Sequence, residues 1–327
     1  MNDELVPFQK VLHTLLDTGK DIPHRYLTEF SDISPSALKS LLDTWPRIEL
    51  KRKLLLLDQL NFLASEDTLV SFDDLGHALL TDSEPQVRLR AMRLLVECEN
   101  VRLVPIYTDM LTNDSDVDIR AEAASMLGLF VQLGEFDDIP DEIHHEIEDV
   151  LLEVFNDEEE PSVRRHALEA LGFSSRMEVP VLIESSFNRQ DPEWKASAIF
   201  AMGRSNDKRW ADHVLQMMVS DDRRIRLAAV QASGELGLAL ARPILLRLLE
   251  EEFDDAIAGA AIWSLSQIGG EDVRLYLQNL LDKVVDDDNQ AAYLEEALDN
   301  LAFTEDMAIF DLLSLDADEP DDIELED

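Results

Sequence analysis

A ten-residue pattern recurs along this chain and restricts what it can fold into. In residues 163–172 it reads VRRHALEALG, with an apolar residue at position zero, arginine at plus one, alanine at plus four and glycine at plus nine. Successive copies begin 32, 44, 31, 31, 32 and 36 residues apart. Repeats of this length are typical of stacked arrays, in which each unit buries its apolar face against its neighbours. The copies begin at Val87, Ile119, Val163, Trp194, Ile225, Ile257 and Tyr293.

The residue at plus four is alanine in every copy, which an ordinary amphipathic helix does not require. We therefore expect this position to lie where two helices approach too closely for a larger side chain. The apolar residues of each copy fall three and four apart, as in a helix, and the alternation of a strand is absent. The seven alanines are Ala91, Ala123, Ala167, Ala198, Ala229, Ala261 and Ala297.

Each copy has a second helical segment upstream, and an acidic turn joins the two. Segments such as VPVLIESSFN at 179–188 carry apolar residues at helical spacing, and turns such as NDEEEPS at 156–162 follow them. Aspartate and serine in such turns accept hydrogen bonds from the free N–H groups of the next helix, and negative charge suits its positive end. The sequence thus predicts an all-α fold, an α-solenoid (superhelix) of stacked antiparallel helix pairs.

The pattern resembles HEAT repeats, specifically the short-period HEAT-like type of phycobilisome bilin lyases and their relatives. The resemblance covers about residues 71–317. It rests on the aspartate turns, the conserved spacing of the alanines, and the closing glycines Gly128, Gly172, Gly203 and Gly234. It implies a fold and transfers no reaction. The last two copies depart from the pattern, with Ser266 and Ala302 in place of the glycine, as suits a drifting or capping end.

An arginine follows the first apolar residue in several copies. The resemblance implies that this side chain reaches an acidic turn of a neighbouring repeat and forms a structural ladder. In the last two copies Ala258 and Leu294 replace it. The expected ladder residues are Arg88, Arg120, Arg164 and Arg226.

Three regions fall outside the regular array. Residues 1–70 predict an N-terminal helical cap with a degenerate repeat, because the end of a solenoid would otherwise expose its core. The 44-residue step predicts an acidic insertion near 134–149, either a solvated loop or a functional segment. Residues 318–327 predict an acidic, disordered tail after a repeat array at 71–317.

The chain is strongly acidic, and the charge is uneven. Its 70 acidic and 28 basic residues give a formal charge of −42, with 17 acids and 11 bases in the first 100 residues and 53 and 17 in the rest. Such a chain repels nucleic acid and anionic membranes. The acids either solubilise the protein or attract a partner with a basic surface. The candidate steering residues are Asp137, Asp138, Asp141, Glu142, Glu158, Glu159 and Glu160.

Position plus six of each copy lies opposite the buried positions of the helix and is expected on the concave face. Two copies carry a large aromatic residue there, of the kind enriched at interface hot spots. The alternative is that tight curvature buries these aromatics between repeats. The candidate partner-binding residues are Arg93, Phe200, Gln231 and Trp263.

No catalytic constellation, cofactor motif or metal site is expected. Cys98 is the single cysteine, and the phosphate-binding and nucleophile-elbow motifs are absent. Deoxyhypusine hydroxylase, built from similar repeats, binds iron through paired His-Glu dipeptides, whereas this chain has one, His145-Glu146. His144 and His145 point about 100° apart on a helix, so we expect both to be exposed and neither to share a metal.

The leading hypothesis is a non-enzymatic scaffold or adaptor that binds a protein partner. The alternative is a bilin-lyase-like or chaperone-like subunit that acts on a pigment or cofactor protein. The first ten residues lack the pattern of a signal peptide, and no apolar run approaches the ~20 residues that span a bilayer, so a cytoplasmic protein is expected. The partner, the pathway and the oligomeric state stay open.

Overall fold

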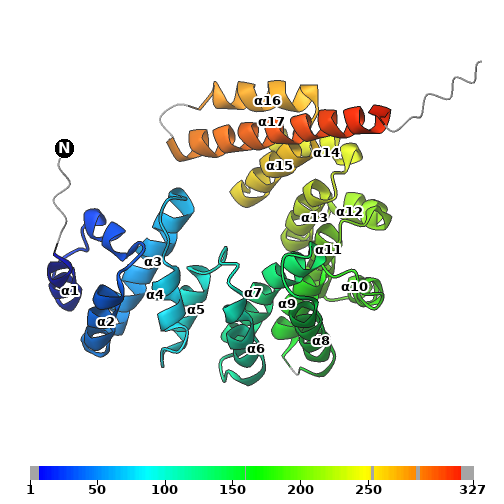
Figure 1. Cartoon of the computed structure of the whole chain (residues 1–327). Helices are drawn as coiled ribbons and strands as arrows, with labels where there is room; N and C mark the ends of the chain where they lie inside the picture. The colour runs from blue at the N-terminus through cyan, green and yellow to red at the C-terminus, as the bar shows by residue number, and fades with distance from the viewer. Residues whose placement is uncertain (1–6, 159, 252–253, 285–287, 318–327) are drawn as a thin grey trace, which may run out of the picture. The chain divides into compact units, whose positions relative to one another are not determined.

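The computed structural model describes residues 7–158, 160–251, 254–284 and 288–317, and these form two compact units, Met1–Ala170 and Leu171–Asp327. Within the described ranges every regular element is helical, with no strand, which confirms the all-α prediction. Figure 1 shows the helices in chain order. The expected acidic tail at 318–327 lies outside the described residues.

The first unit contains an N-terminal group of helices and then helix pairs. The 3-10 turns η1 (His24–Tyr26), η2 (Thr28–Phe30), η3 (Trp45–Arg47) and η4 (Val101–Leu103) connect them. The α-helices are α1 (Phe8–Leu16), α2 (Pro35–Thr44), α3 (Leu50–Glu66), α4 (Asp73–Leu79), α5 (Pro85–Arg93), α6 (Val104–Asn113), α7 (Val117–Glu135) and α8 (Asp141–Asp157), with α9 (Pro161–Leu171) at the boundary between the units.

The second unit continues the helix pairs. Its 3-10 turns are η5 (Lys208–Trp210) and η6 (Ala239–Ala241). Its α-helices are α10 (Val179–Phe187), α11 (Pro192–Arg204), α12 (Ala211–Met217), α13 (Arg223–Glu235), α14 (Arg242–Glu251), α15 (Asp255–Ile268), α16 (Glu271–Leu281) and α17 (Asp288–Ala317).

Each copy of the sequence pattern lies in the second helix of a pair. In the second unit α11 packs on α13, α13 on α15 and α15 on α17, while each second helix also packs on the first helix before it. In the first unit α3 packs on α5 and α5 on α7, so α3 takes the place of a second helix before the array. The row α11, α13 and α15 can be followed in Figure 1.

The alanines at plus four are completely buried in all seven copies, with 0% of each residue exposed. Each sits in a second helix, and α5, α7, α11, α13, α15 and α17 each pack against another second helix. For the copies in these six helices the burial agrees with the prediction of a close helix contact.

Three of the four closing glycines, Gly172, Gly203 and Gly234, lie against the backbone of the next second helix. A Cβ added at Gly203 would lie 2.8 Å from Cα of Ala232, and one added at Gly234 would lie 2.7 Å from Cα of Ser264. At the last interface Ser266 replaces the glycine, and its hydroxyl accepts a hydrogen bond of 2.8 Å from the side-chain amide of Asn300. The departure of the last copies from the pattern thus exchanges close backbone packing for a hydrogen bond.

The acidic turns cap the second helices, as expected. Carboxylate oxygens of Asp116, Asp191, Asp222 and Asp254 accept hydrogen bonds of 2.9–3.1 Å from backbone N–H groups two residues later. These bonds satisfy donors that a helix start leaves free, which gives the acid in these four turns a structural role.

The arginines at plus one hold the turns in place. Arg88 donates 2.9 Å to the carbonyl of Asp82 in its own turn and pairs at 2.8 Å with Asp114 in the next. Arg120 likewise donates 3.0 Å to the carbonyl of Asp114 and pairs at 3.3 Å with Glu158. The expected contact with a neighbouring turn is therefore present at these two positions.

The other two arginines of the predicted ladder also reach carbonyls. Arg164 donates 2.6 Å to the carbonyl of Phe155, and Arg226 donates 2.7 Å to that of Ser220 in its own turn. These bonds tie the start of each second helix to the segment that precedes it.

The extra residues of the 44-residue step lengthen two helices instead of forming a long loop. Helix α7 has 19 residues and α8 has 17, against 13 in α11 and 9 in α10. Residues 136–140 alone connect them. The loop alternative for the insertion is thus wrong, because most of the segment is helix.

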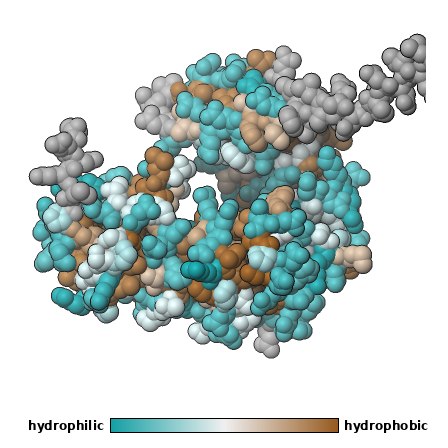
Figure 2. Space-filling view, in the orientation of Figure 1, coloured by the Kyte–Doolittle hydropathy of each residue, from teal (hydrophilic) through white to brown (hydrophobic). Residues whose placement is uncertain are grey.

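Hydrophilic residues predominate on the face that Figure 2 shows. Among the described residues no helix is both long and apolar enough to cross a membrane.

Candidate protein-binding groove

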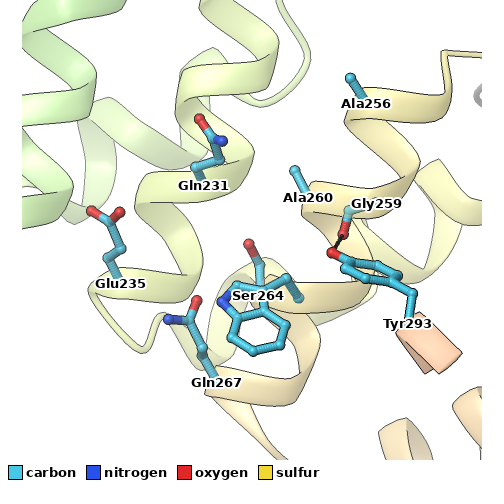
Figure 3. Close-up of a pocket in the computed structure, with 9 residues that line it drawn as sticks. Gln231, Glu235, Ala256, Gly259, Ala260, Ser264, Gln267 and Tyr293 are labelled. Carbon is cyan, nitrogen blue, oxygen red and sulfur yellow. Dashed lines mark hydrogen bonds between the residues drawn. The ribbon is translucent and has the colours of Figure 1, made fainter. Parts of the chain in front are cut away.

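A hollow of about 310 Å³ lies in the second unit on the face of the second helices α13, α15 and α17. Figure 3 shows the side chains of Gln231 and Glu235 projecting from α13, with the Glu235 carboxyl turned away from α15. Tyr293 faces the hollow from α17. The lining residues are Gln231, Glu235, Ala256, Gly259, Ala260, Trp263, Ser264, Gln267 and Tyr293. We call this hollow the groove.

Small residues on α15 make room for the groove. Ala256, Gly259 and Ala260 stand side by side on that helix, and Gly259 leaves its nearest neighbour, the Tyr293 ring, 3.8 Å from an added Cβ. The Tyr293 hydroxyl donates a hydrogen bond of 2.8 Å to the carbonyl of Gly259, which fixes the ring (Figure 3). Trp263 is half-buried and lies one turn further along α15. The groove therefore combines a hydrogen-bonded tyrosine and a half-buried tryptophan with open space.

Polar side chains surround these aromatics. Gln231 and Glu235 are one turn apart on α13, and Gln267 follows Trp263 by one turn on α15. The closing glycines position two of them, because a Cβ at Gly203 would overlap the Glu235 carboxyl and one at Gly234 would overlap the Gln267 amide. Amide and carboxyl groups around an apolar centre can hydrogen-bond a peptide backbone or a basic side chain.

Glu235 is the carboxylic acid of the groove. The residue is exposed, but its carboxyl lies over Gly203, where protein replaces part of the surrounding water. This desolvation raises the pKa of Glu235 to about 7, although the positive charge of Arg204 acts in the opposite direction. A carboxyl with such a pKa loses its proton more readily when a cation binds beside it.

The pH dependence of stability tests this environment. A carboxyl whose pKa is raised from 4.5 in the unfolded chain favours the folded state less as it ionises. We expect wild-type stability, relative to that of Glu235→Gln, to fall as the pH rises from 5 to 7 and then to level off. Urea unfolding of both proteins at several pH values measures the difference, and a difference that is flat with pH would contradict the raised pKa.

The structure brings together two of the four residues predicted on the concave face. Gln231 and Trp263 line the groove. Phe200 does not line it, and the guanidinium of Arg204 covers its ring at 4.2 Å from the centroid. Arg93 belongs to the first unit, where it is exposed and lies 4.0 Å from the carboxylate of Glu122. The four residues occupy the same position in their repeats, but only two of them belong to one site.

The larger side chains of the groove include three that were not among the sequence candidates, namely Glu235, Gln267 and Tyr293. Glu235 and Gln267 occupy position plus ten of their copies, one helical turn after plus six on the same face. Adding four to each candidate position would have found them. Tyr293 occupies position zero, which is buried and apolar in the earlier copies, so no signal in the pattern marked it.

The candidate steering acids differ in exposure and in their contacts. Glu158 is half-buried and pairs with Arg120, so it serves the contact between neighbouring turns. Glu159 lies outside the described residues. The exposed members are Asp137, Asp138, Asp141, Glu142 and Glu160.

The two adjacent histidines of the acidic segment differ in environment. His145 is exposed, as expected, and its Nδ1 lies 2.6 Å from the carbonyl of Asp141. His144 was expected to be exposed and is not, because only 9% of it is accessible. It faces α7, whose extension the sequence pattern did not reveal. Neighbouring histidines on a helix point in different directions, so one could be buried and the other not.

The helix pairs, the buried alanines and the arginine contacts define a helical-repeat protein. The family model for HEAT repeats matches residues 72–172 and 179–266, more than half of the chain. The chain belongs to the HEAT-repeat family. No curated protein sequence matches it.

Solved structures of helical-repeat proteins resemble this fold at low sequence identity. The complex of CpcE and CpcF of phycocyanin lyase from Nostoc sp. PCC7120 is 15% identical, with 87% of this chain and 97% of that chain covered and a TM-score of 0.51. The Escherichia coli protein YibA is 15% identical, with 88% and 98% covered and a TM-score of 0.41. Human deoxyhypusine hydroxylase is 14% identical, with 80% and 95% covered and a TM-score of 0.35. At these identities the likeness concerns the fold alone.

Proposed function

We propose that the protein is a non-enzymatic scaffold that binds a protein partner through the groove. The observation that carries the proposal is that Trp263 and the hydrogen-bonded Tyr293 line the same open space on the face of the second helices. Aromatic residues in such a setting are typical anchors of protein interfaces. Because small residues on α15 keep the space open, a partner side chain can enter without rearranging the helix.

Charge supports a partner with a basic segment. The exposed acids Asp137, Asp138, Asp141 and Glu142 lie in or beside the first turn of α8, and the whole chain carries a formal charge of −42. Long-range attraction depends on the summed charge and raises the rate of encounter more than it slows dissociation. Within the groove Glu235 offers a carboxyl that a lysine or arginine of the partner can pair with.

The alternative of a bilin-lyase-like or chaperone-like subunit rests on likeness of fold to the phycocyanin lyase complex. None of the described groove residues is a cysteine or histidine, the side chains that most readily bond a cofactor covalently or through a metal. A purified protein that absorbs in the visible range would favour this alternative over the scaffold.

The test compares anchor and control variants in partner binding. The partner is captured from the source cells by the immobilised wild-type protein and then purified for kinetics. We expect Trp263→Ala to weaken binding by about 2 kcal/mol, roughly 30-fold, chiefly through faster dissociation. Leu240→Ala removes a side chain of the same unit that is 75% exposed outside the groove and should bind as the wild type does.

The acids give a separate arm of the same experiment. The variant Asp137→Asn, Asp138→Asn, Asp141→Asn, Glu142→Gln should slow association and reduce its dependence on salt, because the attraction acts over about 8 Å at physiological ionic strength. Asparagine also tolerates the positive φ of 61° that Asp137 adopts. A partner that binds Trp263→Ala and the wild type equally would exclude the groove as its site.

A further inference from the structure

Three side chains with metal-binding atoms converge where α7 ends and α8 begins. Nε2 of His144 lies 3.7 Å from Oε1 of Glu135 and 3.6 Å from Oε1 of Glu148. The three ligand atoms all lie within 4.8 Å of one another. His144 and Glu148 are one turn apart on α8, and Glu135 is the last residue of α7.

The cluster is buried and the chain makes room for it. Glu148 is 2% exposed and His144 is 9% exposed. Opposite them on α7, a Cβ at Gly134 would overlap the imidazole ring, so only glycine at this position lets the ring approach. Glu135 is less buried, with 23% of its side chain exposed. Glu148 and His144 are therefore enclosed by protein, whereas Glu135 keeps partial contact with solvent.

The spacing of the three atoms is unusual for hydrogen bonding. Nε2 of His144 is buried without a hydrogen-bond partner among the described residues, although two carboxylates face it. A direct N–H···O bond would bring the atoms to about 2.7–3.2 Å, which is shorter than either contact. Two ligands about 2.1 Å from a tetrahedral metal ion are instead about 3.4 Å apart, which is near the observed distances.

We propose that Glu135, His144 and Glu148 bind a divalent transition-metal ion of the Zn²⁺ class. Imidazole disfavours Mg²⁺ and Ca²⁺, which prefer oxygen ligands alone, and two carboxylates with one imidazole suit zinc, cobalt or manganese. Three protein ligands leave a further coordination position for water or another ligand. The ion would fasten the end of α7 to α8 at the place where the repeat is longest.

The rival explanation is a protonated His144 held between the two carboxylates. The two explanations differ in zinc binding. A metal site binds one zinc ion per chain, whereas a histidine that is ion-paired with two carboxylates binds none. The acidic surface adds weak, unsaturated cation binding in either case, so a matched control on the same helix is needed.

The experiment uses the full chain, freed of metal with a chelator and titrated with Zn²⁺ by calorimetry and with Co²⁺ by visible absorption. We expect one saturable zinc site per chain and the visible bands of low-coordinate cobalt. Glu148→Gln, which keeps the shape of the side chain, should weaken zinc binding by ~100-fold or more and abolish the cobalt bands. The double variant His145→Asn, Glu146→Gln alters the exposed neighbours in α8 and should bind zinc as the wild type does.

Thermal melting supplies a second readout for variants whose stability changes. Zinc should raise the melting temperature of the wild type and of the exposed control, because an ion that binds only the folded state stabilises it. It should leave the melting temperatures of Glu148→Gln and His144→Asn unchanged. The proposal is overturned if the wild type shows no saturable zinc site, or if Glu148→Gln and the control retain equal zinc affinity.

Discussion

Gly234→Ala is expected to lower the free energy of unfolding by about 1–3 kcal/mol, although alanine is the better helix former. An added methyl group at this position would lie 2.7 Å from Cα and 2.8 Å from Cβ of Ser264 in the next second helix. Backbone atoms cannot turn aside as the end of a flexible side chain can, so α13 and α15 must move apart. Urea unfolding followed by far-UV circular dichroism measures the loss.

Gly259→Ala is the matched control, in the neighbouring helix α15. Its added methyl group would find no atom closer than 3.8 Å, from the Tyr293 side chain. The substitution should raise the free energy of unfolding by about 0.5–1 kcal/mol, because glycine in a helix interior costs backbone entropy. The two substitutions are chemically identical and should act in opposite directions. Equal effects would show that the closing glycines do not mark the contact between successive second helices.

This contrast also shows how far the sequence determines the fold. Copies with the same spacing pack in the same way. A small residue that recurs at one position therefore predicts a close contact at that position in every copy. The seven buried alanines and the capping aspartates followed from this regularity. Residues 134–149 occur in a single copy, so the other copies give no information about their structure. A loop was one of the two expectations, and most of these residues are helical.

The candidate sites depend on contacts that the pattern does not encode. The groove needs Tyr293 of α17 to face Trp263 of α15, which rests on a substitution of tyrosine for an apolar residue in the last copy alone. The cluster around His144 needs α7 to extend to Glu135, and the repeat pattern ends before this extension. The spacing of His144 and His145 on one helix shows that they do not share a metal ion. It gives no information about a ligand on another helix, such as Glu135.

Arg88→Met is expected to lower the free energy of unfolding by about 3 kcal/mol, because it leaves the carboxylate of Asp114 without its partner in a largely buried place. Both side chains of this pair are 12% exposed, at a distance of 2.8 Å. Methionine keeps much of the aliphatic volume, so the loss reports the charge and the bond to the carbonyl of Asp82. The loss stays at the low end of the range for buried pairs because Asp114 still accepts a hydrogen bond of 2.9 Å from the N–H of Asp116.

A second substitution and an exposed arginine make this prediction specific. Asp114→Asn keeps an oxygen for the N–H of Asp116 and removes the charge, so the double variant with Arg88→Met should recover about 1 kcal/mol or more of the loss. Arg224 pairs with both Asp222 and Glu193, yet its side chain is 52% exposed, and Arg224→Met should leave the unfolding midpoint unchanged. If Arg224→Met costs as much as Arg88→Met, burial does not decide the value of these pairs, and the arginine at plus one has no special part in holding successive turns together.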